Sequence, residues 1–206
     1  MLKNLANNPH QQIILASSSA YRKELLARLC LPFITISPEI DENPKAMESP
    51  DQTAMRLAQE KAEEIALQYP EAIIIGSDQV ATLEGMQIGK PGNHVRALQQ
   101  LQAMRGKTVI FHTALCVISK LPQTQNYATQ LQNCQTIVRF RDLSDIELDA
   151  YLHIEKPYDC AGSAKNEGLG IALLESIEND DPTALTGLPL IALTTMLRNL
   201  GVKFFA

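Results

Sequence analysis

The run Ala-Ile-Ile-Ile-Gly-Ser at residues 72–77 is the clearest sign of a central strand in this sequence. It is apolar and rich in isoleucine, without the alternation of polar and apolar residues that a half-buried strand shows. A strand covered by helices on both faces has this character. Asp78 follows directly, so we expect a carboxylate at the carboxyl end of a buried strand, where α/β proteins place ligands. Such a group either serves a divalent metal or a water molecule, or is a solvated turn residue.

Regular elements are predicted on both sides of this strand. Upstream, apolar spacing and capping residues indicate strands at residues 13–16 and 33–36 and helices at residues 20–29 and 50–68. Downstream, the same signals indicate a hairpin of residues 80–83 and 86–88, a helix at residues 93–104, strands at residues 108–118 and 135–140, a helix at residues 145–155, a strand at residues 168–177 and a helix at residues 190–200. We therefore predict an α/β fold with a mixed, twisted sheet and flanking helices.

The composition is that of an ordinary globular protein. The chain has 206 residues, 45% hydrophobic and 20% charged, which is enough for one domain with a substantial core. We predict a single domain over residues 1–206, with residues 1–12 as a loose N-terminal leader. The net charge of −5 argues against a protein that coats DNA or RNA, yet it leaves room for one small polyanion in a basic pocket.

Targeting and redox signals are weak. No signal peptide and no apolar run long enough to cross a bilayer is recognisable, so no membrane partner is expected. The four cysteines lie far apart and form no C-x-x-C pair, which gives a zinc site or a redox dithiol little support. We expect reduced thiols and a cytoplasmic location.

A junction between a strand and a helix offers a first candidate for phosphate binding. Leu-Ala-Ser-Ser-Ser-Ala-Tyr-Arg at residues 15–22 ends a strand, supplies three hydroxyls and begins a helix. The unpaired N–H groups and the dipole of a helix start favour phosphate. Ser17 could accept or donate there, and Arg22 could grip a phosphate with two N–H groups. The alternative is that the serines only cap the helix and Arg22 is solvated.

Scattered charges form a second group of candidates. Asp41 and Glu42 could supply oxygen ligands to the metal that Asp78 would hold, and Lys61 and Lys90 could neutralise phosphates. Taken one by one, each of these residues is more often a surface charge. A glycine-rich loop at residues 159–170 could approach a ligand closely or serve only as a connector.

Together these stretches resemble the Maf family of nucleoside triphosphate pyrophosphatases. The resembling stretches are, in chain order, LASSSAYRKELL, SPEIDE, RLAQEKA, IIGSDQV, GKPG, MRGKTVIFHTAL, RFRDLS, YDCAGSAKNEGLGI and TGLPLIAL. The resemblance implies two lobes around a cleft and a fold like that of inosine triphosphate pyrophosphatases. It also implies hydrolysis of a nucleoside triphosphate to the monophosphate and pyrophosphate with a divalent cation, Mg²⁺ or Mn²⁺, and a homodimer.

The family's charged residues match particular positions of this chain. Asp78 looks like the catalytic carboxylate, and Glu42, Lys61 and Lys90 look like the other charged residues of the active site. Asp78 and Glu42 would hold the metal.

The family's phosphate-binding pair corresponds to Ser17 and Arg22. The family usually has proline where this chain has Ala20, a difference that would affect only the shape of the helix start.

Three further positions resemble the branch of the family that acts on 7-methyl-GTP. They are Tyr21, Gln79 and Glu167. The branch that acts on dTTP and UTP would show arginine, threonine and glutamine there, whereas the 7-methyl-GTP branch often has tryptophan in place of Tyr21. A dTTP/UTP or broad-specificity pyrophosphatase is one alternative. A nucleotide-binding regulator of cell division without turnover is another, although the acidic pair beside two lysines favours an enzyme.

Overall fold

The computed structural model describes residues 11–120 and 126–205. Its strands are β1 (Ile13–Ala16), β2 (Phe33–Ile36), β3 (Ile73–Leu83), β4 (Met86–Ile88), β5 (Thr108–Lys120), β6 (Tyr127–Phe140) and β7 (Leu174–Glu178). Its α-helices are α1 (Ala20–Ala27), α2 (Pro50–Gln68), α3 (His94–Met104), α4 (Asp145–Glu155) and α5 (Leu190–Asn199). Short 3₁₀ helices are η1 (Ala161–Ser163), η2 (Leu169–Leu173) and η3 (Ala184–Thr186).

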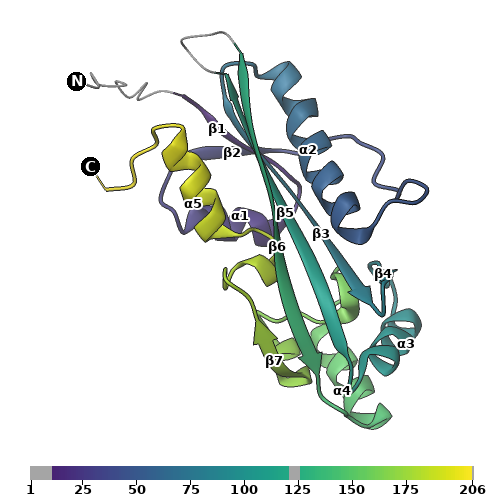
Figure 1. The fold of residues 1–206 in the computed structure, drawn as a ribbon. Coiled ribbons are helices and arrows are strands. Elements are labelled where there is room, and N and C mark those ends of the chain that lie inside the picture. The colour runs from purple at the N-terminus through teal and green to yellow at the C-terminus, as the bar shows by residue number, and fades with distance from the viewer. Residues whose placement is uncertain (1–10, 121–125, 206) are drawn as a thin grey trace.

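The strands form one mixed sheet in the order β2-β1-β3-β5-β6-β7, with β4 paired to β3. The pairs β1–β2 and β1–β3 are parallel, whereas β3–β5, β5–β6 and β6–β7 are antiparallel. Helices flank this sheet, which confirms the predicted fold class (Figure 1). Among the described residues, no helix is long and apolar enough to span a bilayer.

Two lobes share the long strands β3, β5 and β6. The first lobe contains β1, β2, α1, α2 and α5, and the second contains β4, α3, α4 and β7 (Figure 1). Side chains alternate between the faces of β3. Ile74 faces a cluster with α2, whereas Ile73 and Ile75 face a cluster with α1 and α5. Farther along β3, Ala81 and Leu83 belong to the core of the second lobe.

Strand β3 is longer than its sequence suggests. The prediction ended the strand at residue 77 and placed Asp78 at its carboxyl end, whereas β3 runs unbroken to Leu83 with Asp78 in its middle. The predicted hairpin is confirmed, because Leu83 pairs with Met86 across a two-residue turn. Both turn residues, Glu84 and Gly85, have positive φ, as a type I′ turn requires.

A gap in the pairing of β3 creates the place for a site. One edge of β3 pairs with β5 throughout residues 74–83. The other edge pairs with β1 up to Gly76 and with β4 only from Ala81. Residues 77–80 therefore face no strand on that edge, and the chain leaves β1 there to begin α1.

Helix α2 lies unusually close to β3 beside this gap. A Cβ atom on Gly76 would come within 2.2 Å of the Ala58 carbonyl oxygen and within 2.9 Å of the Ala62 Cβ. Only glycine allows this approach. As a result, side chains from this part of α2 can reach the polar residues of β3.

Three other predicted boundaries differ from the structure. Helix α1 ends at Ala27 because its last turn tightens into i→i+3 hydrogen bonds. Strand β6 begins at Tyr127, well before residue 135. Residues 169–173 form the 3₁₀ helix η2, so β7 begins only at Leu174. Gly170 lies against the Lys165 backbone there, which shows that the chain folds back on itself.

The predicted leader falls largely outside the described residues, which begin at Gln11. The Gln11 side chain donates a hydrogen bond to the Ser119 hydroxyl at 2.9 Å. The Gln12 carbonyl accepts from the Ile73 N–H at 2.8 Å.

Candidate active site

A cleft of about 690 Å³ opens at the gap between the lobes. Its walls come from the β1–α1 junction, α2, the middle of β3, the turn after β4 and the loop around η1. Of the residues predicted for the site from sequence, all but Asp41 line it, namely Ser17, Tyr21, Arg22, Glu42, Lys61, Asp78, Gln79, Lys90 and Glu167. The fold thus brings together side chains that lie far apart along the chain.

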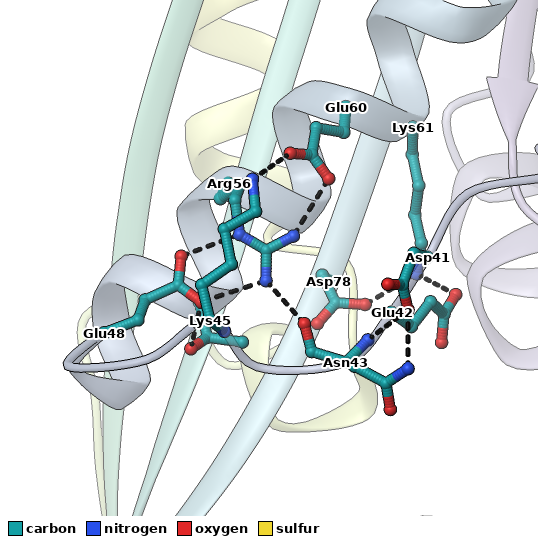
Figure 2. Close-up of polar contacts among 10 residues, drawn as sticks. Asp41, Glu42, Asn43, Lys45, Glu48, Arg56, Glu60, Lys61 and Asp78 are labelled. Carbon is teal, nitrogen blue, oxygen red and sulfur yellow. Dashed lines mark hydrogen bonds and ion pairs between the residues drawn. The ribbon is translucent and has the colours of Figure 1, made fainter.

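Lys61 connects the two acidic residues of the cleft. Its ammonium group donates to Asp78 Oδ1 at 2.6 Å and to Glu42 Oε1 at 2.7 Å (Figure 2). Asp78 and Lys61 are buried between β3 and α2, whereas Glu42 sits on an exposed loop. Lys61 thus bridges the two carboxylates and occupies one oxygen of each.

The acidic pair fits a divalent metal. Within the described residues, Lys61 occupies one oxygen of Asp78 and one of Glu42, so each carboxylate has a second oxygen without a protein partner. Carboxylate oxygens are the ligands that Mg²⁺ and Mn²⁺ prefer. Desolvation opposes ionisation of Glu42, but the hydrogen bond and charge of Lys61, helped by Lys90 and Arg22, lower its pKa below the usual value. Glu42 is therefore ionised and ready to bind a cation.

Arg22 and Ser17 form a connected unit at the start of α1. Arg22 Nε donates to the Gly187 carbonyl at 2.9 Å and its Nη1 to Ser17 Oγ at 3.4 Å. Ser19 caps the helix by accepting from the Arg22 N–H. Burial lowers the pKa of Arg22, while Asp78 and Glu42 oppose that shift. A guanidinium stays protonated even so, and Arg22 presents a fixed positive charge to the cleft.

Lys90 supplies an exposed positive charge to the lining of the cleft. It follows β4 in an exposed turn, and within the described residues it forms no ion pair with an acidic side chain. Its charge still reaches the acidic pair, because it contributes to the lowered pKa of Glu42. The cleft thus has three cationic side chains near one pair of carboxylates.

Gln79 points to the face of the sheet opposite Asp78. Its Nε2 atom donates to Thr113 Oγ1 at 2.9 Å and to the carbonyls of Ala184 at 3.1 Å and Leu185 at 3.0 Å. These three acceptors occupy both N–H groups of the amide, leaving only Oε1 for a ligand. Ser77, on the same face, donates to the Gly187 carbonyl at 2.9 Å. Both residues thereby fix the segment around η3 to β3.

A different environment surrounds Tyr21. Its hydroxyl accepts from Cys160 Sγ at 3.9 Å. Burial first, and then the charges of Cys160, Asp159 and Glu167, raise the pKa of Tyr21. The Lys165 ammonium lies 5.9 Å from the centre of the Tyr21 ring and pairs with Glu155 at 3.1 Å. This end of the cleft therefore combines an aromatic ring with two exposed carboxylates.

Two residues of this end were missed from sequence. Asp159 and Cys160 line the cleft, although the sequence indicated only the glycine-rich loop that contains them. Burial raises the pKa of the Cys160 thiol to about 11, so it is protonated at neutral pH. A run of small residues beside a cysteine carries no signal that would single out either side chain.

Asp41 does not reach the cleft, contrary to the expectation that it could be a metal ligand. Its Oδ1 accepts from the backbone N–H of Asn43 at 3.0 Å and from the Asn43 side chain at 2.7 Å. This local turn directs Asp41 back onto its own loop. Glu42, the next residue, is left as the acidic side chain of the loop that lines the cleft.

Arg56 holds this loop against α2, a role that the sequence did not reveal. It donates to both oxygens of Glu48 at 2.7 and 2.9 Å, to Glu60 at 2.9 Å and to the Asn43 carbonyl at 3.0 Å (Figure 2). The hydrogen bonds from Arg56 and the Lys45 N–H lower the pKa of Glu48 to about 2. Glu48 is therefore ionised at any physiological pH, and the hydrogen bond from Arg56 anchors Asn43, the residue next to Glu42.

Comparison with known proteins places the chain in a family. A sequence model of Maf-like proteins matches residues 12–200. The chain belongs to the Maf family. Curated Maf relatives named 7-methyl-GTP pyrophosphatase occur in Ralstonia nicotianae (62% identity over 94% of this chain and 98% of that protein), Burkholderia pseudomallei (60%, over 94% and 90%) and Cupriavidus pinatubonensis (57%, over 98% and 100%).

Among solved structures, the match is more distant. The Staphylococcus aureus Ham1 protein aligns with this Maf chain at a TM-score of 0.46 and 13% identity, over 64% of this chain and 73% of that one. A likeness at this level does not bear on function.

Proposed function

We propose that this Maf protein hydrolyses 7-methyl-GTP to 7-methyl-GMP and pyrophosphate, cutting between the α- and β-phosphates. The observation that carries the proposal is the division of charge along the cleft. Arg22, Lys61 and Lys90 lie around the acidic pair at one end, and Tyr21 with Asp159 and Glu167 lies at the other. A nucleotide with an anionic triphosphate and a cationic base has the matching distribution. The names of the curated relatives point the same way.

The phosphate end would carry the chemistry. Asp78 orients the attacking water and accepts its proton, since it is fixed in the rigid centre of β3 by Lys61. Arg22, Lys61 and Lys90 neutralise the charge that grows on the departing pyrophosphate. Mg²⁺ or Mn²⁺, held by Asp78 and Glu42, would neutralise phosphate oxygens when bound.

The other end would select the base. Methylation at N7 puts a delocalised positive charge on guanine. The Tyr21 ring can attract that charge through its π face, which is worth about 0.5–2 kcal/mol. Glu167 can pair with the charge or accept from the guanine N–H groups. Gln79 would contact the base or ribose through Oε1, the atom its own hydrogen bonds leave open.

A pyrophosphate-release assay tests the proposal. kcat/KM is measured for 7-methyl-GTP, GTP, dTTP and UTP in wild type, Tyr21→Ala, Tyr21→Phe and Glu167→Gln. We expect wild type and Tyr21→Phe to prefer 7-methyl-GTP, and Tyr21→Ala and Glu167→Gln to lose much of that preference. Tyr69→Ala, a partly exposed tyrosine outside the cleft, serves as the matched control.

The alternatives have distinct signatures in the same assay. A preference for dTTP or UTP would assign the chain to the other Maf branch, and similar rates on all four nucleotides would indicate broad specificity. Nucleotide binding without pyrophosphate release would indicate a regulator. Wild-type activity should also disappear with EDTA and return with Mg²⁺ or Mn²⁺, because a polyphosphate and two carboxylates repel each other without a cation. Full activity in metal-free buffer would contradict the metal assignment.

A further inference from the structure

Two histidines and an aspartate meet in the second lobe, outside the cleft. His94 Nε2 lies 2.7 Å from Asp149 Oδ1, and His153 Nδ1 lies 3.3 Å from Asp149 Oδ2. The centres of the two imidazole rings are 4.7 Å apart. Each side chain offers one donor atom, and all three donor atoms lie within 4.8 Å of one another. None of the three residues lines the cleft.

The three donors come from two helices that are not adjacent in sequence. His94 is the first residue of α3, whereas Asp149 and His153 lie one turn apart on α4. An i, i+4 pair on one helix face, joined by a third ligand from a neighbouring helix, is a common framework for a metal site. The side chains of His94 and Asp149 are half-buried, whereas that of His153 is exposed and its Nδ1 also lies 2.9 Å from the Asp149 backbone carbonyl oxygen.

A second contact orients the His94 ring. Its Nδ1 lies 3.1 Å from the Tyr158 hydroxyl, which leaves Nε2 directed at Asp149. Histidines that bind metals usually have their other ring nitrogen held by an oxygen in this way. The Tyr158 backbone is fixed in turn, because its carbonyl accepts from the Gly92 N–H at 3.0 Å. The ring is thus oriented from outside the cluster.

The charge of the cluster also suits a cation. Within the described residues, Asp149 pairs with the two imidazoles and with no lysine or arginine. Two imidazole nitrogens and a carboxylate oxygen are ligands of Zn²⁺ and similar borderline-soft ions, rather than of Mg²⁺. Bonds of about 2.0–2.2 Å to a tetrahedral ion would place the donors about 3.4 Å apart, which small side-chain rotations reach from the present spacing.

We propose that His94, Asp149 and His153 form a binding site for a divalent transition-metal ion of the Zn²⁺ class, with solvent completing the coordination. The ion would join the start of α3 to α4 and so stabilise the second lobe. His94 lies four residues after Lys90, so the ion would also restrain the rim of the cleft. The proposal does not depend on the reaction of the cleft.

The test uses the full-length, untagged protein and Zn²⁺ alone as the probe. Binding is measured by equilibrium dialysis with a competing chelator in wild type, His94→Gln, Asp149→Asn and His153→Gln. His112→Gln controls for loss of a histidine, and Asp78→Asn removes a ligand of the metal expected in the cleft. We expect one Zn²⁺ per wild-type chain, and roughly tenfold or greater weakening in each cluster variant but in neither control. Excess Mg²⁺ should not displace the Zn²⁺.

Two further measurements distinguish this site from the metal site expected in the cleft and from a site with cysteine ligands. Co²⁺ in place of Zn²⁺ should give visible absorption without a thiolate charge-transfer band, and Zn²⁺ should raise the Tm of wild type but not of Asp149→Asn. The proposal is overturned if Zn²⁺ binds the cluster variants as tightly as wild type, or if Asp78→Asn alone abolishes binding. A thiolate band in the Co²⁺ spectrum would also overturn it, because the ion would then sit on cysteine.

Discussion

Lys61 determines how the two carboxylates of the cleft can act. Its buried ammonium lies 2.6 Å from Asp78 Oδ1 and 2.7 Å from Glu42 Oε1, so it holds the two carboxylates close together. The contact also orients Asp78, because Lys61 and Asp78 are both buried and lie on a helix and a strand. Asp78 is therefore the better oriented of the two acids, and Glu42 depends on its loop for its position.

The substitution Asp78→Asn tests this assignment. Asparagine nearly matches aspartate in shape and can still accept from Lys61, but it carries no negative charge. We expect the fold to persist and turnover to fall by roughly 10²- to 10⁴-fold. Pyrophosphate release and Tm are measured together. A variant that keeps a large part of the wild-type rate would show that the catalytic carboxylate lies elsewhere.

Arg56 is expected to act on the reaction through Glu42. Arg56→Ala frees the loop that Asn43 and Glu48 anchor, so the Mg²⁺ concentration for half-maximal activity should rise by about tenfold. Arg56→Lys should restore part of the shift, since it keeps the charge but not the fork of N–H groups.

Arg28→Ala, which removes an exposed arginine paired to Glu24 at 3.9 Å, is the control for the Arg56 variants. If Arg56→Ala lowers the Tm but needs the same Mg²⁺ concentration for half-maximal activity as wild type, Arg56 contributes only to stability.

At the scale of elements, the contact between α2 and β3 positions the site. Gly76 lets the helix approach closely enough for Lys61, from the same helix, to reach Asp78 on the same strand. Interiors are too closely packed to absorb an added methyl group at such a point without movement. The spacing of these two elements is thus a condition for the Lys61–Asp78 contact.

The substitution Gly76→Ala should separate α2 from β3. The new Cβ would meet the Ala58 carbonyl oxygen at 2.2 Å, so we expect a loss of about 1–3 kcal/mol in the free energy of unfolding. Urea denaturation measures the change. Gly89→Ala, where an added Cβ would meet nothing within 4 Å, should leave stability nearly unchanged. Equal stability of the two variants would mean that the close approach at Gly76 does not matter.

Elements with a strong local signal were predictable from sequence. Residues 13–16 and 73–77 are apolar runs, and the capping boxes at Ser49 and Ser144 begin α2 and α4 as expected. The first half of β6 carries no such signal, because residues 127–134 are largely polar and exposed. That segment is a strand because it pairs with the buried β5 along its whole length.

The course of β3 through the site could not be predicted for a related reason. Ser77, Asp78 and Gln79 look like the end of a strand because they are polar. Their side chains form hydrogen bonds with residues on α2, on β5 and in the segment around η3, which are 17 to 110 positions away in the chain. A local sequence pattern cannot predict hydrogen bonds to such distant residues. The family resemblance indicated most of the charged residues that line the cleft, and the structure adds Asp159 and Cys160 to its lining and Arg56 to the loop that carries Glu42.

At the scale of the whole molecule, the two lobes are parts of one sheet. β3, β5 and β6 contribute side chains to the core of the second lobe and to a core cluster of the first. A lobe cannot unfold without exposing the strands on which the other depends. The cleft is therefore bounded by elements that share one framework, which suits a site that must keep charged groups in fixed positions.

We accordingly expect unfolding in a single transition. The chain contains no tryptophan, so Tyr69→Trp and Tyr158→Trp give separate fluorescence probes for the first and second lobes. Within each variant, the urea midpoint by fluorescence should coincide with the midpoint by far-UV circular dichroism. A second lobe that melts at lower urea than the overall secondary structure would show that the shared strands do not couple the lobes.

The two ends of the cleft have different origins in the chain, and this has an evolutionary consequence. On the proposed division of the cleft, the reactive end is built from the β1–α1 junction, the loop before α2, α2, β3 and the turn after β4, whereas residues 159–167 supply much of the base end. On that proposal, a lineage can alter the short later segment, together with the positions of Tyr21 and Gln79, and acquire a new base preference while the hydrolytic residues stay unchanged. Exchange of that segment between Maf branches is the corresponding route for redesign.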